Sequence, residues 1–275
     1  MAQSQTGDSP KKFQPTEIGV AFGVAPGFLR NIATNDINAF TPGSDLLLKA
    51  NGMQSNPLFL SGLDAHLQIW AGFALKGKAD PLLRLGLSYT TMQNDLRSYS
   101  RSNEFVYDTL RSTNGTHVVY ADSMYSEWLF AEQFSQHLRL DAALLWHSKN
   151  KGPFSLFAGV GGQAGVSVLS RSRVTYHHTG SQRYRAESDS TGRGFWPNMR
   201  VLEHSTEIFG NGLQFASSVY LPIGISLRLG AAGSPLEKAQ IFVQCTPSFT
   251  LMHLPEHGWV SAQQFLGQLG MRFGL

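Results

Sequence analysis

The sequence predicts an all-β protein, specifically an eight-stranded antiparallel transmembrane β-barrel in an up-and-down meander. Apolar residues recur at every second position along most of the chain, and only a strand sends neighbouring side chains to opposite faces in this way. Charged residues make up 15% of the 275 residues and aromatic residues 11%, with 28 glycines; soluble globular proteins carry about 25% charged residues. No stretch approaches the roughly 18 apolar residues of a transmembrane helix.

Eight segments carry the period of two and are taken as strands. In segment 153–170, the even positions from Phe154 to Val168 are apolar apart from Gly162, and the odd ones are small or polar apart from Phe157. The odd-numbered series from Leu213 to Leu229 behaves similarly and is long for an ordinary strand. The expected strands are 16–24, 60–75, 82–97, 124–147, 153–170, 211–230, 239–252 and 259–275.

Two architectures have strands that alternate in this way, a soluble sandwich and a membrane barrel. The residues on the polar faces distinguish them. A soluble sandwich exposes Lys, Glu and Thr, whereas the polar positions here hold mainly Gly, Ser, Gln and Ala with single charges. This composition suits the narrow interior of a membrane barrel, whose apolar face contacts lipid. A barrel must close to leave no unpaired edge in lipid, so the first strand is expected to pair with the last.

The connections alternate between short turns and long loops. The expected organisation is a flexible periplasmic tail over residues 1–14, followed by a barrel over 15–275. Its long outer loops are placed at 25–58, 97–125 and 170–211.

Segment 124–147 fits the strand pattern least well, because Glu132 and Gln136 fall on its apolar face. A bulge near Ser135–Gln136, or a rim above the membrane, would accommodate them. The alternative is a hairpin within this segment.

The charge and the cysteine content argue against several kinds of function and site. The net charge is +3 and the basic residues are scattered, which does not indicate nucleic-acid binding. The single cysteine, Cys245, excludes an internal disulfide and a cysteine-cluster metal site. The start lacks a signal-peptide core, and the segment AQSQ is typical of a mature N-terminus. We therefore expect an exported protein whose signal peptide has been removed.

The last strand and two strand–turn–strand segments carry a family resemblance. The segment QFLGQLGMRFGL resembles an outer-membrane β-signal, with the near-terminal aromatic residue Phe273. The segments LDAALLWHSKNKGPFSLFAGVGGQAG and VYLPIGISLRLGAAGSPLEKAQIFVQCTPSFTL resemble the small outer-membrane β-barrel proteins of Bacteroidota, which include PorT-like proteins. The resemblance covers about residues 130–275 and implies an outer-membrane location. The resemblance is specific for the architecture and says little about activity, because members of the family differ mostly in their loops; one of them, PorT, is a component of type IX secretion.

Charged residues at inward positions form the first candidate site. Four arginines and three acids are nearly balanced, and charges buried in a narrow barrel are costly unless they pair. The structural interpretation is an ion-pair network that fills the lumen, and the functional one is a selectivity ring or a proton path. The expected network is Glu17, Asp64, Arg84, Arg139, Asp141, Arg228 and Arg272.

The third long loop forms the second candidate site because it is rich in arginine and aromatic residues. These residue types are frequent at interface hot spots and at contacts with anionic sugar phosphates. Outer-membrane lipid, including lipopolysaccharide, or an envelope protein would be the partner; the alternative is a solvated, partly β-extended loop. The candidate binding residues are Arg173, Tyr176, Arg183, Tyr184, Arg185 and Trp196.

Enzymatic activity is not expected, and no catalytic residue, cofactor or metal site is assigned. The third loop holds His177, His178 and His204, but no spacing enforces a catalytic triad. The nearby serines and acids are Ser181, Ser188, Asp189 and Glu203. The expected function is that of a non-enzymatic outer-membrane protein with a plugged lumen, acting as a structural, binding or complex-subunit barrel. The alternatives are a lipid-modifying enzyme of the acyltransferase or deacylase kind, and then a small-solute porin. A large apolar loop surface would favour the complex subunit.

Overall fold

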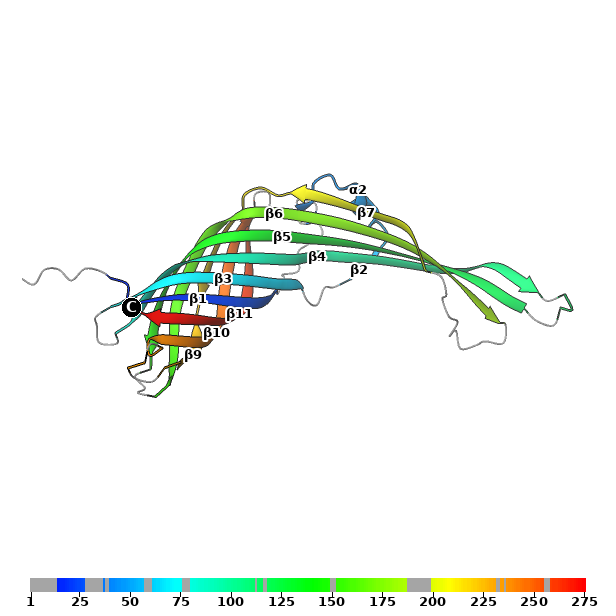
Figure 1. Cartoon of the computed structure of the whole chain (residues 1–275). Helices are drawn as coiled ribbons and strands as arrows, with labels where there is room; N and C mark the ends of the chain where they lie inside the picture. Colours follow the sequence, from blue (N-terminus) through cyan, green and yellow to red (C-terminus); the bar gives the residue numbers. More distant parts are fainter. Residues whose placement is uncertain are drawn as a thin grey trace, which may run out of the picture.

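The computed structural model describes residues 14–27, 37, 40–56, 61–75, 80–111, 113–115, 118–148, 152–186, 199–230, 233–234, 236–254 and 258–275. The expected tail therefore lies almost wholly outside the described residues. The described chain is antiparallel β-structure with one short helix (Figure 1). Its elements are β1 Glu17–Gly27, α2 Asp45–Leu48, β2 Gln54–Asn56, β3 Ser61–Ala74, β4 Leu82–Arg111, β5 Val118–His147, β6 Phe154–Ala186, β7 Arg200–Gly210, β8 Phe215–Tyr220, β9 Ile223–Arg228, β10 Ala239–Leu254 and β11 Gly258–Gly274.

The strand pairings form a closed path, which we call the ring. From β1 the path passes through β3, β4, β5 and β6, crosses β8 and β9, and returns through β10 and β11. Glu17 lies opposite Gly72 of β3 on one side and Gly274 of β11 on the other. The prediction of an all-β antiparallel chain is confirmed, and so is the pairing of the first strand with the last.

The expected strand 211–230 is interrupted at Pro222, which separates β8 from β9. Proline has no backbone N–H and cannot donate to a neighbouring strand. The chain nevertheless keeps its place, because Gly159 N donates to Pro222 O at 2.9 Å and Leu221 N donates to Pro247 O at 3.0 Å. Strands β8 and β9 therefore follow one another between β6 and β10.

Three strands continue far beyond the ring and form what we call the arm. Strands β4 and β5 have 30 residues each and β6 has 33, and Figure 1 shows them running side by side past the ends of β1, β3 and β11. Strand β7 pairs with the outer part of β6, and β2 with β4. Much of the expected loops 97–125 and 170–211 is thus strand. The prediction relied on strict alternation of apolar and polar residues, which these segments do not keep.

A bulge in β6 decides which arm residues face inward. Gln136 lies opposite Leu169 and His137 opposite Ser167, so Val168 is the extra residue. The even positions of β6 face outward before Val168, whereas Ser172, Val174 and Tyr176 are buried after it. Strand β5 keeps one alternation from Leu129 to Leu145. A bulge was expected near Ser135–Gln136, and it lies in the partner strand at the same level; no hairpin forms.

Burial in the ring is the reverse of that in a soluble protein. The outward Leu140 is 69% exposed, whereas the inward Arg84 and Asp141 are 2% and 3% exposed. The same contrast holds along the other strands of the ring, with Leu156, Val219 and Leu269 exposed. Among the described residues, no helix has the length and apolarity needed to cross a bilayer.

Candidate functional site

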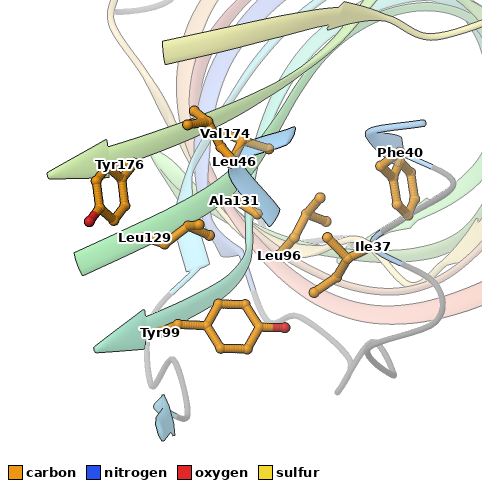
Figure 2. Close-up of a cluster of buried hydrophobic side chains, with 9 residues drawn as sticks. All are labelled: Ile37, Phe40, Leu46, Leu96, Tyr99, Leu129, Ala131, Val174 and Tyr176. Carbon is orange, nitrogen blue, oxygen red and sulfur yellow. The ribbon is translucent and has the colours of Figure 1, made fainter. Parts of the chain in front are cut away.

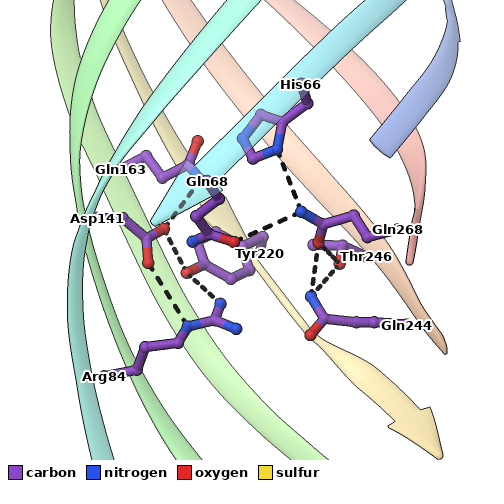
Figure 3. A network of polar contacts seen from close by, with 9 residues as sticks. All are labelled: His66, Gln68, Arg84, Asp141, Gln163, Tyr220, Gln244, Thr246 and Gln268. Atoms are coloured by element: carbon purple, nitrogen blue, oxygen red, sulfur yellow. Dashed lines mark hydrogen bonds and ion pairs between the residues drawn. The ribbon is translucent and has the colours of Figure 1, made fainter. Parts of the chain in front are cut away.

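An ion pair bridged by a phenol lies inside the ring (Figure 3). Arg84 Nε is 3.7 Å from Asp141 Oδ1. The Tyr220 hydroxyl donates to Asp141 Oδ2 at 2.6 Å and accepts from Arg84 Nη2 at 3.2 Å, and Gln163 Nε2 donates to the same carboxylate oxygen at 2.9 Å. Four strands, β4, β5, β6 and β8, are tied together through this one carboxylate.

A glutamine forms a second junction beside the first (Figure 3). Gln268 of β11 accepts from Gln244 Nε2 at 2.8 Å, and its own amide nitrogen lies 3.1 Å from His66 Nδ1 and 3.4 Å from Gln68 Oε1. Thr246 donates to the same Gln268 oxygen at 3.2 Å. Neutral amides and hydroxyls therefore do much of the bridging that charged pairs were expected to do.

Arg272 closes the interior at the end where both chain termini of the ring lie. Its guanidinium donates to Gln240 Oε1 at 2.8 and 3.1 Å, to Ser226 Oγ at 2.9 Å and to His147 Nε2 at 2.5 Å. Glu17 Oε2 lies 3.9 Å from Arg272 Nη1. The closure of β1 on β11 brings this ion pair together.

The remaining expected network residues behave differently from one another. Asp64 accepts from Gln93 N at 3.2 Å and from Gln264 Nε2 at 2.9 Å. Arg139 is buried and donates to the Met92 sulfur at 3.5 Å. Arg228, which was expected in the lumen, has an exposed side chain. It is the last residue of β9, and a side chain at a strand end reaches bulk water.

Aromatic rings fill the interior next to Arg272. Trp70 and Phe157 both meet Phe242 edge to face, with ring centroids 5.6 and 5.9 Å apart. Glycines on neighbouring strands make room for the rings: a Cβ at Gly161 would lie 2.4 Å from Tyr220 Cζ, and one at Gly270 2.3 Å from Phe242 Cζ. The cavity lined by the polar residues has a volume of about 30 Å³, which is room for about two waters.

Residues of the first expected loop pack across the arm end of the ring, and we call the segment 40–53 the cap. Figure 2 shows its apolar side chains lying with those of β4, β5 and β6. The buried cluster consists of Ile37, Phe40, Leu46, Leu96, Tyr99, Leu129, Ala131, Val174 and Tyr176. Ser44 is the N-cap of α2 and accepts from Leu47 N, and this Ser-Asp-Leu-Leu sequence was the signal that could have revealed the cap.

Strand β7 holds the cap through two carboxylates. Glu207 accepts from Ser44 Oγ at 2.5 Å and from Leu46 N at 3.3 Å. Glu203 pairs with Lys49, whose ammonium also lies 4.2 Å from the ring centroid of Tyr176. The hydrogen bond from Lys49 lowers the pKa of Glu203.

Two residues expected to bind a partner are structural. Tyr176 is buried and donates to Glu127 Oε1 at 3.0 Å; burial and this hydrogen bond raise its pKa to about 12. Arg183 is buried and donates to Glu104 at 2.6 Å and to Asp122 at 3.0 Å. Both side chains therefore have partners within the arm. The bulge at Val168 places the even-numbered Tyr176 inward, but it does not account for the odd-numbered Arg183.

The other expected binding residues divide between exposed and undescribed positions. Arg173 is exposed and pairs with Glu132, the acid that fitted its strand poorly. Tyr184 is 52% exposed. Arg185 lies in β6 opposite Tyr120, but its side chain lies outside the described residues, as does the whole of Trp196.

A strip of apolar and aromatic residues crosses the arm, and the sequence did not single it out. Phe105 of β4 and Tyr125 of β5 stack with centroids 5.8 Å apart, and His178 of β6 lies 5.7 Å from the Tyr125 ring. A Cβ at Gly180 would lie 3.0 Å from Leu202 Cδ1 and 3.4 Å from Tyr125 Cε1, so Leu202 of β7 adjoins the same ring. Phe105, Tyr125 and Leu202 are all exposed. We call these four side chains the arm strip.

The histidines considered for a hydrolytic site lie on the outer part of β6 and on β7. His204 and His177 contact each other through their Nδ1 atoms at 3.1 Å. His137 Nε2 lies 3.1 Å from Ser135 Oγ, but both residues are buried within the sheet. Ser188 and Asp189 lie outside the described residues. Within the described residues, no group of three or more His, Cys, Asp or Glu side chains is arranged to hold a metal ion.

Comparison with known proteins gives matches among solved structures alone, at low identity and low TM-score. No family model matches the chain, and no curated protein matches it. Among solved structures, Neisserial surface protein A matches at 10% identity and a TM-score of 0.29, covering 94% of this chain and 97% of that one. Ail of Yersinia pestis matches at 8% identity and a TM-score of 0.24, covering 94% and 100%. The translocator domain of the autotransporter NalP from Neisseria meningitidis matches at 6% identity and a TM-score of 0.21, covering 97% and 90%. The resemblance to the Bacteroidota family stays a prediction.

Proposed function

We propose that the chain is a non-enzymatic outer-membrane protein: an eight-stranded transmembrane β-barrel with a plugged lumen, whose arm docks another envelope protein. The reversed burial of the ring supports the membrane location, since exposed rows of Leu, Ile, Val and Phe need lipid around them and the buried charges lie inside. The count of eight rests on taking β8 and β9 as one interrupted strand of the wall.

The arm strip is the observation that carries the docking role. Large apolar and aromatic side chains are gathered on one face of a sheet that extends beyond the ring, where a bilayer would not cover them. Exposed patches of this kind mark protein–protein contacts, and aromatic residues dominate their binding energy. A protein fits this strip better than the sugar phosphates of lipopolysaccharide, because Arg101, Arg173 and Arg183 of the arm already pair with carboxylates.

The two alternative functions have less support. A lipid-modifying enzyme needs a nucleophile that lipid can reach, whereas Ser135 and its partner His137 are buried. A porin needs an open lumen, whereas the ring holds the Arg84–Asp141 pair, a layer of aromatic rings and a cavity of about 30 Å³. In planar bilayers we expect the folded protein to give no steady, porin-sized current; reproducible large currents would favour the porin.

The membrane assignment is tested with two matched arginine substitutions. Leu140→Arg places a charge on the outward face of the ring, and Leu110→Arg places one at an exposed position of the arm. In phospholipid vesicles, Leu140→Arg is expected to lower the free energy of unfolding by roughly 2–4 kcal/mol, and Leu110→Arg by much less. Equal effects of the two substitutions would contradict the assignment.

The docking role is tested by photo-crosslinking in native outer membranes. A photoreactive residue at Phe105 is expected to give a discrete adduct with one envelope protein, identified by mass spectrometry. The control is the neighbouring Val106, which lies on the opposite face of β4. The adduct is expected to disappear when Tyr125→Ser is added. Equal labelling from both positions, or adducts only with lipopolysaccharide, would refute protein docking.

A further inference from the structure

Two histidines face each other across the pairing of β6 with β7. His177 and His204 are direct cross-strand neighbours, and their Nδ1 atoms lie 3.1 Å apart with ring centroids at 4.4 Å. The edge of Phe130 packs against the His177 ring at a centroid distance of 6.4 Å. The backbone register therefore brings two imidazole nitrogens to one point on the arm, where His204 is exposed.

We propose that His177 and His204 form a two-histidine site for a divalent transition-metal ion such as Zn²⁺, Ni²⁺ or Cu²⁺. Imidazole nitrogens bind such ions at about 2.0–2.1 Å, so two nitrogens 3.1 Å apart subtend an angle of about 98° at the metal. This angle lies between the square-planar or octahedral value of about 90° and the tetrahedral value of about 109°. The pair is thus spaced as a chelate before any metal arrives.

The proton balance at the site is simple. With both rings neutral, the contact between the Nδ1 atoms is a hydrogen bond, in which one Nδ1–H donates to the lone pair of the other. Metal binding uses both Nδ1 lone pairs, so that proton moves through water to the Nε2 of the same ring. Two protein ligands leave further coordination positions to water or to donor groups of a docked protein.

A metal at this position would clamp the strand that holds the cap. In the described sheet β7 pairs with β6 alone, and its Glu203 and Glu207 hold Lys49 and Ser44 of the cap. A bond from β6 to β7 through the metal would oppose separation of this edge strand. The site thereby links metal binding to the stability of the cap, whatever partner the arm strip takes.

The test is a titration of the purified, folded full chain in detergent micelles with Zn²⁺ and Cu²⁺, followed by calorimetry and, for Cu²⁺, by electron paramagnetic resonance. We expect one saturable site, bound more tightly by Cu²⁺ than by Zn²⁺, with a spectrum of nitrogen ligation. His177→Gln and His204→Gln are each expected to abolish it. His178→Gln is the matched control and should retain it, because His178 faces the opposite side of β6, near Tyr125.

Hydrogen exchange supplies a second readout on the same samples. Zn²⁺ is expected to slow exchange in residues 200–210 of the wild type and of His178→Gln, but not of His204→Gln. Unchanged binding in both His177→Gln and His204→Gln, or loss of binding in His178→Gln, would refute the site. The characteristic shift in gel mobility of folded barrels on heating shows that each variant is folded before it is titrated.

Discussion

The hydroxyl of Tyr220 donates a 2.6 Å hydrogen bond to Asp141, and the same oxygen accepts from Arg84. A phenol on β8 thus completes an ion pair between β4 and β5, which sequence periodicity alone does not connect. Trp70 covers the guanidinium, with its ring centroid 5.2 Å from Arg84 Cζ. The strands of the ring are thus linked by polar side chains, and each of these side chains contacts several others.

Removing Asp141 should therefore be costly. Asp141→Ala leaves Arg84 buried without its carboxylate, and the loss of one partner of a buried pair costs about 3–5 kcal/mol. The measurement is urea unfolding of the protein folded in phospholipid vesicles. Arg228→Ala is the control, since this arginine is exposed and should change the free energy of unfolding by less than about 1 kcal/mol. Similar losses in both variants would mean that Asp141 is not a buried junction.

Adjacent glycines in β6 provide a second comparison. A methyl group at Gly161 would lie 2.4 Å from the Tyr220 ring, whereas at Gly162 its nearest neighbour is Ser218 O at 3.5 Å. We expect Gly161→Ala to destabilise the protein by about 1–3 kcal/mol through overpacking, and Gly162→Ala to be nearly neutral. Urea unfolding in vesicles distinguishes the two. A neutral Gly161→Ala would show that Tyr220 is free to move, which its hydrogen bonds argue against.

The cap should loosen when Glu207 is removed. Glu207→Ala deletes the acceptor of Ser44 Oγ and Leu46 N, and the loss of such a capping contact costs about 1 kcal/mol. Hydrogen exchange in residues 40–53 is expected to become faster. Glu104→Ala removes a comparable carboxylate from the arm, where Arg183 keeps its bond to Asp122, and should leave exchange in the cap unchanged. The role of Glu207 would be disproved by equal exchange rates in the two variants.

The raised pKa of Tyr176 predicts that the protein loses stability at alkaline pH. Its pKa is raised to about 12 in the folded chain, against about 10 for an unfolded tyrosine. The neutral phenol is thus favoured by folding, and its contribution is fully present below pH 10 and is lost as the pH rises to about 12. The thermal midpoint of the wild type should fall more steeply over this range than that of Tyr176→Phe. Parallel curves would contradict the burial of the phenol.

Periodicity predicted the ring well, because successive side chains of a strand point to opposite faces. The positions of Leu140, Arg84 and Asp141 follow from alternation alone, and the pairing of β1 with β11 follows from the need to satisfy every backbone group of the wall. That pairing brings together Glu17 and Arg272, two members of the expected network, at 3.9 Å. The sequence also indicated a bulge at the level of Ser135–Gln136.

Only the tertiary structure decided which strand carries that bulge. The extra residue, Val168, changes the inward face of β6, so Tyr176 joins the arm interior and could not be assigned from alternation counted along the chain. The cap was missed because its apolar residues are few and irregularly spaced, and they are buried by strands distant in the sequence. Local sequence thus determined the direction of each side chain within an uninterrupted strand. Register between strands, which depends on contacts far apart in the chain, determined the rest.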